Sequence, residues 1–275
     1  DEKYMRHAIE LAKKGLGWTN PNPMVGAVIV KDGKIIGEGY HKKYGELHAE
    51  TSALNNCTKS PEGATIYVTL EPCCHHGKQP PCTEAIIKAG IKRVVIGSLD
   101  PNPLVSGKGM QILREHNIQV DNKLVCNREC IDMNYVFFHY IKEKLPYVIV
   151  KYAQTLDGKI ATHNGLSKWI TGEAARENVH MDRHRYSAIM VGINTVLKDD
   201  PMLNCRSKAI ENPHQPVRIV CDTKLRIPYD SKLVKTAGQI PVWIVTCCHD
   251  KERISMYENA GCEIIAMEGE KIDIA

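Results

Sequence analysis

Three metal-binding side chains constrain the fold of this chain more than any other feature of its sequence. His48 stands two residues before Glu50, and Cys73 and Cys82 follow in a second segment that begins with Pro72. One imidazole and two thiolates can hold a zinc ion and leave its fourth position open to water, while a carboxylate that does not bind the metal carries protons. The two segments must therefore converge in space. We predict a zinc site of His48, Cys73 and Cys82, with Glu50 as the catalytic proton shuttle.

The last metal ligand has several candidates in this sequence. Zinc deaminases of nucleobase-like rings usually end their signature in Pro-Cys-x-x-Cys, but position 76 is His here. Cys74, one of His75 and His76, and Cys82 therefore compete for the last ligand position. Cys82 opens the helical run 83–89, and a helix N-terminus stabilises a thiolate through its dipole and its free N–H groups. We choose Cys82 on this ground and predict hydrolytic deamination as the chemistry.

Length and composition limit the class of protein. The 275 residues suffice for two domains, and 43% hydrophobic with 25% charged residues is typical of a soluble globular protein. No apolar run is long enough to span a membrane, and the sequence opens with charged residues instead of a signal peptide. Eleven cysteines without secretory features predict reduced thiols in the cytoplasm. The net charge of +4 is scattered, which fits an anionic small molecule and is weak evidence for nucleic acid. We therefore expect neither a nucleic-acid nor a membrane partner.

The first half of the sequence alternates helical and strand patterns. Asp32-Gly33 between two strand-like runs is a strong hairpin signal. The expected elements are a helix at 3–14, strands at 24–30, 35–40, 65–70 and 93–97, and helices starting at Ala49 and after Cys82. This order predicts an α/β domain with a mainly parallel sheet and helices on its faces. The metal-binding loops would lie at the carboxyl ends of the strands, where such sheets bind ligands.

A domain boundary is expected where a helical segment at 127–142 meets Pro146. Proline stops the helix, and the following residues 147–152 are predicted to form a strand. We therefore expect a zinc-dependent deaminase domain at 1–143 and a second α/β domain at 147–275. In the second domain the predicted elements are a helix at 173–185 and strands at 188–191, 217–221 and 242–246.

The sequence segments around the predicted zinc residues resemble those of one enzyme family. They are Thr19-Asn20-Pro21-Asn22-Pro23-Met24-Val25-Gly26, Gly45-Glu46-Leu47-His48-Ala49-Glu50, the long run Leu70 to Cys82, and Asp100-Pro101-Asn102-Pro103. The second half adds the runs 151–159, 167–171 and 199–201. Together they resemble the bifunctional deaminase/reductase of riboflavin biosynthesis over essentially the whole chain. The resemblance implies a cytidine-deaminase-like three-layer α/β/α domain followed by a dihydrofolate-reductase-like α/β domain.

The resemblance also implies two reactions. The first is zinc-dependent hydrolytic deamination of 2,5-diamino-6-ribosylamino-4(3H)-pyrimidinone 5′-phosphate, and the second is NADPH-dependent reduction of its ribosyl group to ribityl. Substrate residues of the deaminase carried over by position are Asn22, His41, His75 and Lys78. Cofactor contacts carried over are Ala153, Trp169, Thr195, Asp199 and Thr223, and reductase substrate contacts are Ser167, Arg183, Leu203 and Arg206. The two arginines, Arg183 and Arg206, suit a phosphate, and Lys151 at a strand end could meet the reacting sugar.

Three features of the sequence bear on alternative functions. The NADPH assignment depends on the resemblance, because the sequence has no Gly-x-Gly-x-x-Gly. The family's reductase domain continues into a Glu-Gly-Gly-like turn that has no counterpart before Ala275, so we expect a C-terminally incomplete reductase half and, as one alternative, deaminase activity alone. A nucleoside or tRNA deaminase is disfavoured by the long Cys73-to-Cys82 loop and the second domain.

A zinc-stabilised binding module without catalysis is the remaining class. It is disfavoured because structural zinc sites close their shell with four protein ligands, whereas this site has three beside Glu50. We further expect the chain to form a homo-oligomer.

Overall fold

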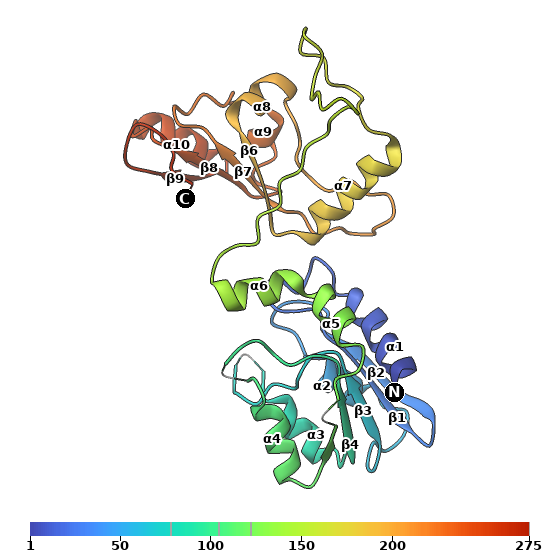
Figure 1. Cartoon of the computed structure of the whole chain (residues 1–275). Helices are drawn as coiled ribbons and strands as arrows, with labels where there is room; N and C mark the ends of the chain where they lie inside the picture. Colours follow the sequence, from blue (N-terminus) through green and yellow to red (C-terminus); the bar gives the residue numbers. More distant parts are fainter. Residues whose placement is uncertain (78, 104, 122, 275) are drawn as a thin grey trace. The chain divides into compact units, whose positions relative to one another are not determined.

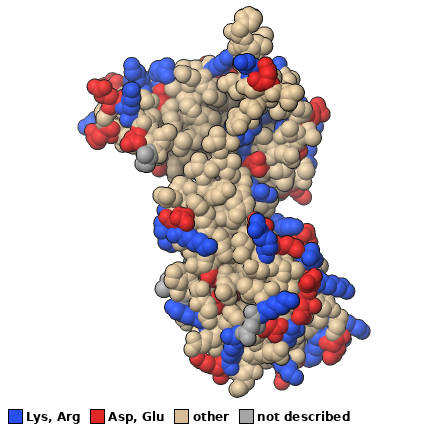
Figure 2. Space-filling view, viewed as in Figure 1, with Lys and Arg blue, Asp and Glu red and all other residues tan. Residues whose placement is uncertain are grey.

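Two compact units make up the chain, Asp1–Val150 and Lys151–Ala275, each with its own sheet and core (Figure 1). The computed structural model describes residues 1–77, 79–103, 105–121 and 123–274. No helix in these described ranges has the length and apolar content needed to cross a lipid bilayer. On the face drawn in Figure 2, basic and acidic side chains are interspersed over each unit.

The first unit contains a five-stranded sheet with the order β2-β1-β3-β4-β5. Its strands are β1 (Gly26–Lys31), β2 (Lys34–Tyr40), β3 (Thr65–Val68), β4 (Arg93–Ile96) and β5 (Gln119–Val120). Its helices are α1 (Glu2–Lys13), α2 (Ala49–Asn55), α3 (Cys82–Lys88), α4 (Lys108–Glu115), α5 (Asn127–Met133) and α6 (Tyr135–Glu143). The predicted hairpin is confirmed, because β1 and β2 pair antiparallel. β1 also runs against β3, while β3, β4 and β5 are parallel, so the mainly parallel sheet is confirmed with β1 as the exception.

Alternation of side chains along the strands divides the first unit into three layers. In β1, Ala27 and Ile29 face a core built with α2, α3 and α4, whereas Val28 and Val30 face a second core built with α1 and α5. Figure 1 shows α1 and α5 on one side of the sheet and α3 and α4 on the other. Successive strand residues point to opposite faces, so a strand covered on both sides is apolar throughout. The predicted three-layer α/β/α arrangement is confirmed.

Strand directions bring separate segments to one edge of this sheet. β2, β3, β4 and β5 all point the same way, so the residues that follow them lie at the same edge. β1 points the opposite way, so the residues that precede it reach this edge too. His41 follows β2, Glu71 to Cys73 follow β3, Asp100 follows β4, and Asn22 precedes β1. The sheet thus collects the predicted deaminase residues from distant parts of the sequence.

The predicted helix at 127–142 is two helices, which end and begin at Asn134. The Asn134 side chain accepts a hydrogen bond from the Met24 nitrogen and donates one to the Met24 oxygen, each 2.8 Å long. A short polar side chain that bonds to backbone groups competes with helix continuation. The break therefore ties the C-terminal helices of the unit to the segment before β1.

The predicted strand at 147–152 is wrong. No sheet pairing is found for these residues in the described structure, and the side chains of Val148 and Val150 are 76% and 80% exposed. β-branched residues favour strands only where a neighbouring strand and a packing surface are at hand. Propensity alone was therefore misleading at this position.

The second unit contains an all-parallel four-stranded sheet with the order β6-β7-β8-β9. Its elements are α7 (Glu173–Arg185), β6 (Ala188–Gly192), α8 (Ile193–Asp199), β7 (Val217–Cys221), α9 (Lys232–Lys235), β8 (Val242–Thr246), α10 (Lys251–Asn259) and β9 (Glu263–Ala266). The helix predicted at 173–185 and the three predicted strands are confirmed. Apolar residues of α8, α9 and α10 pack on β7 and β8 to form the core of this unit.

A buried cation, Arg218 on β7, links the loops of the second unit. Its side chain is 0% exposed. The guanidinium donates to the Met202 oxygen (3.2 Å), the Thr236 hydroxyl (2.8 Å) and oxygen (3.1 Å), and the Ile240 oxygen (2.6 Å). Burial lowers the pKa of Arg218 to about 10, so the group stays charged near neutral pH. Carbonyl acceptors compensate its desolvation and fix the Thr236–Ile240 turn against β7.

The position of α2 depends on the absence of a side chain at Gly39 of β2. A Cβ at Gly39 would lie 2.3 Å from the Ala53 nitrogen and 2.6 Å from the Ala49 oxygen, both in the backbone of α2. Only glycine permits this close approach of helix and strand. Because α2 carries Glu50 and starts directly after His48, the contact also sets the depth of these two side chains.

We predict that Gly39→Ala lowers the free energy of unfolding by about 1–3 kcal/mol, because the added methyl forces α2 away from β2. Chemical denaturation measures the loss, and hydrogen exchange of the α2 amides should quicken. Gly238→Ala is the matched control, since a Cβ there meets nothing within 4 Å. Wild-type stability and exchange in Gly39→Ala would contradict the proposed packing.

Candidate metal centre and active site

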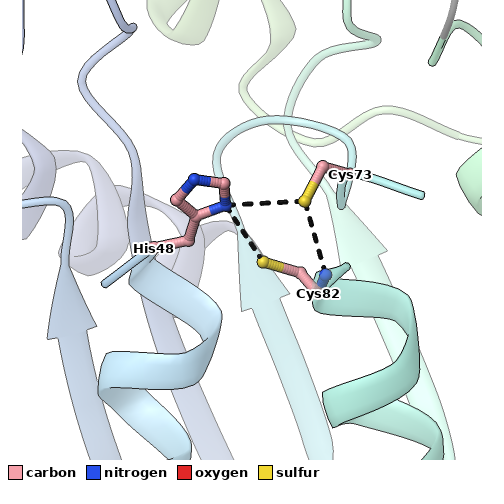
Figure 3. Close-up of side chains that lie close together, drawn as sticks. All are labelled: His48, Cys73 and Cys82. Atoms are coloured by element: carbon pink, nitrogen blue, oxygen red, sulfur yellow. Dashed lines mark hydrogen bonds between the residues drawn. The ribbon is translucent and has the colours of Figure 1, made fainter. Parts of the chain in front are cut away.

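The three predicted metal ligands meet at one point in the first unit. His48 is the residue before α2, Cys82 is the first residue of α3, and Cys73 lies in the loop after β3. Their nearest ligand atoms all lie within 4.8 Å of one another. Figure 3 shows the His48 ring nitrogen and the two sulfur atoms directed toward the same space. The two segments singled out in the sequence therefore converge.

The spacing of the donor atoms fits zinc. The Nδ1 atom of His48 lies 3.5 Å from the Cys73 sulfur and 3.3 Å from the Cys82 sulfur. Tetrahedral zinc with usual bond lengths would hold such a nitrogen and sulfur about 3.6 Å apart. Two thiols and one imidazole also match the ligand preference of this ion. A zinc ion held by these three residues would keep its fourth position open to water.

Hydrogen bonds already favour a thiolate at Cys73. Its sulfur accepts a hydrogen bond from the Cys82 backbone nitrogen at 3.3 Å, and its carbonyl accepts one from the Thr83 nitrogen at 3.2 Å. The hydrogen bond from the Cys82 thiol is the main cause that lowers the pKa of Cys73 to about 4, and the same bond raises the pKa of Cys82. A thiolate is the form that binds metal. The site is thus electrostatically prepared for a cation.

Glu50 lies beside this cluster without being part of it. Its side chain is 3% exposed and lies in the first turn of α2. Burial, followed by the charge of Cys73, raises the pKa of Glu50 to about 7. A carboxyl group that exchanges a proton near neutral pH is well suited to general acid–base catalysis.

A cavity of about 390 Å³ opens next to the cluster and contains both His48 and Glu50 in its wall. Asn22 and His41 also line it, with the Asn22 amide nitrogen 3.3 Å from Nε2 of His41. The other ring nitrogen of His41, Nδ1, lies 3.0 Å from the Leu47 oxygen, and burial lowers the pKa of this histidine. A neutral ring that donates from Nδ1 to Leu47 accepts from Asn22 at Nε2.

The competing ligand candidates lie differently. Cys74 is outside the cluster of described residues that could hold a metal, and burial raises the pKa of its thiol. His76 is exposed and lies 3.4 Å from Glu84, whereas His75 is exposed at the wall of the cavity. Lys78, the remaining predicted substrate residue, lies outside the described residues.

Several residues of the cavity wall received no individual role from the sequence. Asp100 is nearly buried, accepts a hydrogen bond from the Asn102 nitrogen at 2.8 Å, and has its pKa raised by burial. Its position in the segment that follows a strand at the ligand-binding edge was the available signal. Phe137 and Tyr140 of α6 also line the cavity, and nothing local in the sequence indicated this.

Predicted cofactor residues of the second unit gather partly at one sheet edge. Gly192 at the end of β6 pairs with Cys221 at the end of β7. α8 begins after Gly192 and carries Thr195 and Asp199 on its exposed side, while Thr223 follows Cys221. Residues four apart share a helix face.

The other predicted residues of this unit come from segments outside β6, α8 and β7. Lys151, Ser167 and Trp169 are exposed, and Ala153 is half-buried. The Trp169 ring stacks on the Arg176 guanidinium at 4.4 Å. The side chain of Leu203 is buried in the core, so only its backbone remains for a ligand contact.

The two predicted phosphate-binding arginines meet at Asn204. Arg183 donates to the Asn204 oxygen at 3.0 Å, and Arg206 donates to the Asn204 side-chain oxygen at 2.5 Å. The Arg183 Nε is buried and has no hydrogen-bond partner within the described part of the chain. Burial, and then the nearby Arg206 charge, lowers the pKa of Arg183. Two adjacent cations with spare donors form a site suited to an anion.

Comparison with known proteins supports both halves of this description. Residues 1–98 match the cytidine and deoxycytidylate deaminase zinc-binding region, and residues 146–275 match the RibD C-terminal domain. The riboflavin biosynthesis protein RibD of Actinobacillus pleuropneumoniae is 56% identical over 265 residues, which are 96% of this chain and 69% of that protein. RibD of Aquifex aeolicus is 48% identical over 269 residues, which are 98% of this chain and 74% of that protein.

Solved structures of related proteins also match both units of this chain. The diaminohydroxyphosphoribosylaminopyrimidine deaminase/5-amino-6-(5-phosphoribosylamino)uracil reductase from Thermotoga maritima is 43% identical with a TM-score of 0.83, covering 96% of this chain and 80% of that one. RibD from Acinetobacter baumannii is 41% identical with a TM-score of 0.86, covering 98% of this chain and 74% of that one. With this identity across both units, the chain belongs to the family of the riboflavin biosynthesis protein RibD.

Proposed function

We propose that this chain is a deaminase/reductase of riboflavin biosynthesis. Its first unit would deaminate 2,5-diamino-6-ribosylamino-4(3H)-pyrimidinone 5′-phosphate, and its second unit would reduce the ribosyl group with NADPH. The observation that carries the proposal is the convergence of His48, Cys73 and Cys82 beside the buried Glu50 at a cavity. An open three-ligand site with an adjacent carboxyl group is built for catalysis.

In the first reaction His48, Cys73 and Cys82 would hold zinc, which when bound would supply a water of lowered pKa. Glu50 takes a proton from the attacking water and delivers it to the departing amino group, so that ammonia leaves the ring. Its pKa of about 7 lets it accept and return the proton near neutral pH. The buried setting of Glu50 keeps bulk water from competing for that proton.

Substrate orientation is assigned to Asn22 through its contact with His41. Because Nε2 of His41 accepts from the Asn22 amide nitrogen, the Asn22 carbonyl oxygen is directed to other donors. Ring amino groups of a diaminopyrimidine are such donors. His75 and Lys78, which lie between Cys73 and Cys82 in the sequence, are assigned to the remainder of the substrate, where basic side chains suit the phosphate.

In the second reaction Thr195, Asp199 and Thr223 would hold NADPH at the shared edge of β6 and β7, together with Ala153 and Trp169. The cofactor supplies a hydride when bound. Carboxyl ends of parallel strands are the usual dinucleotide position in such sheets. Arg183 and Arg206 would bind the substrate phosphate, and Lys151, Ser167 and the Leu203 backbone would contact the sugar.

Zinc analysis tests the ligand assignment. We expect about one zinc per chain in the wild type, loss of most zinc in Cys82→Ser, and retention in Cys74→Ser, since Cys74 lies outside the cluster. Atomic absorption on the purified proteins gives the ratio. Zinc loss in Cys74→Ser with retention in Cys82→Ser would show that the wrong cysteine has been assigned.

Replacing Glu50 tests the proton transfer. Glu50→Gln should keep its zinc but deaminate the pyrimidinone phosphate at least about a hundredfold more slowly, because an amide cannot exchange the proton. Ammonia release and product mass are measured together with zinc content. Normal turnover by this variant would exclude the proposed role, and absence of ammonia release by the zinc-loaded wild type would exclude the deaminase function.

Phosphate recognition by the second unit can be tested without reduction. Ribose 5-phosphate should raise the unfolding temperature of the wild type, whereas unphosphorylated ribose should not, because the paired guanidinium groups recognise the phosphate. Arg183→Gln and Arg206→Gln should lose this shift, while Arg185→Gln, a neutral replacement on the same helix, should keep it. An equal shift in all four proteins would place the phosphate elsewhere.

A further inference from the structure

We propose that Glu71 is a positioning residue that sets the affinity of the site for zinc. Its hydrogen bonds hold the loop between β3 and α3, which carries Cys73, against the start of α4. The inference rests on the proposed zinc site and assigns a task to a residue that the metal does not touch. Glu71 stands two residues before Cys73, and its side chain is 3% exposed although it is a carboxyl group. A buried carboxyl group needs hydrogen-bond partners.

The partners of Glu71 are backbone groups at the N-terminus of α4. One carboxyl oxygen accepts from the Gly107 nitrogen at 3.0 Å, and the other accepts from the Met110 nitrogen at 3.3 Å. Gly107 is the N-cap residue and offers no side chain to cap the helix. In a capping box two local side chains satisfy these two N–H groups, but here one distant carboxyl group satisfies both.

A second, independent contact presses the same two segments together. A Cβ at Gly109 would lie 2.3 Å from the Pro72 oxygen and 3.3 Å from a Glu71 carboxyl oxygen. The helix backbone therefore approaches the residue immediately before Cys73 more closely than any side chain permits. Glu71 and Gly109 together fix the distance between α4 and the metal loop.

Cys73 needs this support more than the other ligands do. His48 and Cys82 stand at the starts of α2 and α3, whose packing fixes them. Cys73 lies in a loop, where the Glu71 nitrogen donates to the Ser98 oxygen at 2.9 Å and the Glu71 side chain adds the link to α4. Outer groups that orient ligands typically change metal affinity by about 10- to 100-fold.

The test measures the zinc dissociation constant by competition with a chromophoric chelator. We expect Glu71→Ala to bind zinc at least about tenfold more weakly than the wild type. Gly109→Ala should weaken zinc binding as well, because its methyl pushes α4 off Pro72 although the Glu71 side chain is still present. Glu71→Gln keeps the length and one acceptor oxygen, so it should recover part of the affinity.

Asp250→Ala separates this role from a general loss of stability. Asp250 caps α10 in the second unit by accepting hydrogen bonds from the Glu252 and Arg253 backbone nitrogens. Its replacement therefore removes two hydrogen bonds at a helix start, as Glu71→Ala does, but far from the metal ligands in sequence. This control should lower the unfolding temperature yet leave the zinc constant unchanged. The absorption spectrum of the Co²⁺-loaded protein, which reports thiolate ligation, should change in Glu71→Ala and not in Asp250→Ala.

Two different outcomes would contradict the role of Glu71 and the zinc site itself. Glu71→Ala with a zinc constant within twofold of the wild type, or a loss equal to that of Asp250→Ala, would overturn the positioning role while leaving the zinc site intact. A wild type that binds neither Zn²⁺ nor Co²⁺ would instead overturn the zinc site itself, and the inference with it.

Discussion

The common direction of four strands in the first unit is the constraint on which its site depends. Parallel strands bring their carboxyl ends to one edge, and a single reversed strand brings the segment before it to the same edge. His41, Cys73 and Asp100 therefore meet there although they are far apart in sequence. The helices α2 and α3 start at this edge, where His48 stands directly before α2 and Cys82 is the first residue of α3.

Electrostatics at the site follow from burial combined with charge. Glu50 and the two cysteines lie in a poorly solvated space, where a hydrogen bond between thiols stabilises one thiolate and burial keeps the carboxyl group partly protonated near neutral pH. A metal cation favours the thiolates, while Glu50 remains outside the ligand cluster and able to exchange its proton. In the proposed mechanism, the same low solvation serves both metal binding and proton transfer.

Close backbone contacts at two glycines fix the positions of the segments that carry this site. α2 rests on β2 at Gly39, and α4 rests on Pro72 at Gly109. Rigid contacts of this kind transmit position because a packed backbone cannot give way as a flexible side chain does. In the second unit a different device fixes the turn after α9, where carbonyl groups surround the buried Arg218.

The sequence by itself determined the metal-ligand set, the adjacent carboxyl group, the two-part α/β organisation and most helices and strands. Those features depend on local patterns: the spacing of His48, Glu50, Cys73 and Cys82, and the periodicity of apolar residues. The hairpin at Asp32-Gly33 and the helix Glu173–Arg185 were predicted for the same reason.

Only the tertiary structure decided features that arise between distant segments. Asn134 interrupts a helical pattern because its side chain bonds to Met24, and residues 147–152 remain without a sheet partner in the described structure despite strand-like composition. The burial of Glu71 on α4 and the entry of Phe137 into the cavity wall are likewise long-range contacts. Local propensity cannot report such contacts, because their free energy comes from neighbours that the chain meets only after folding.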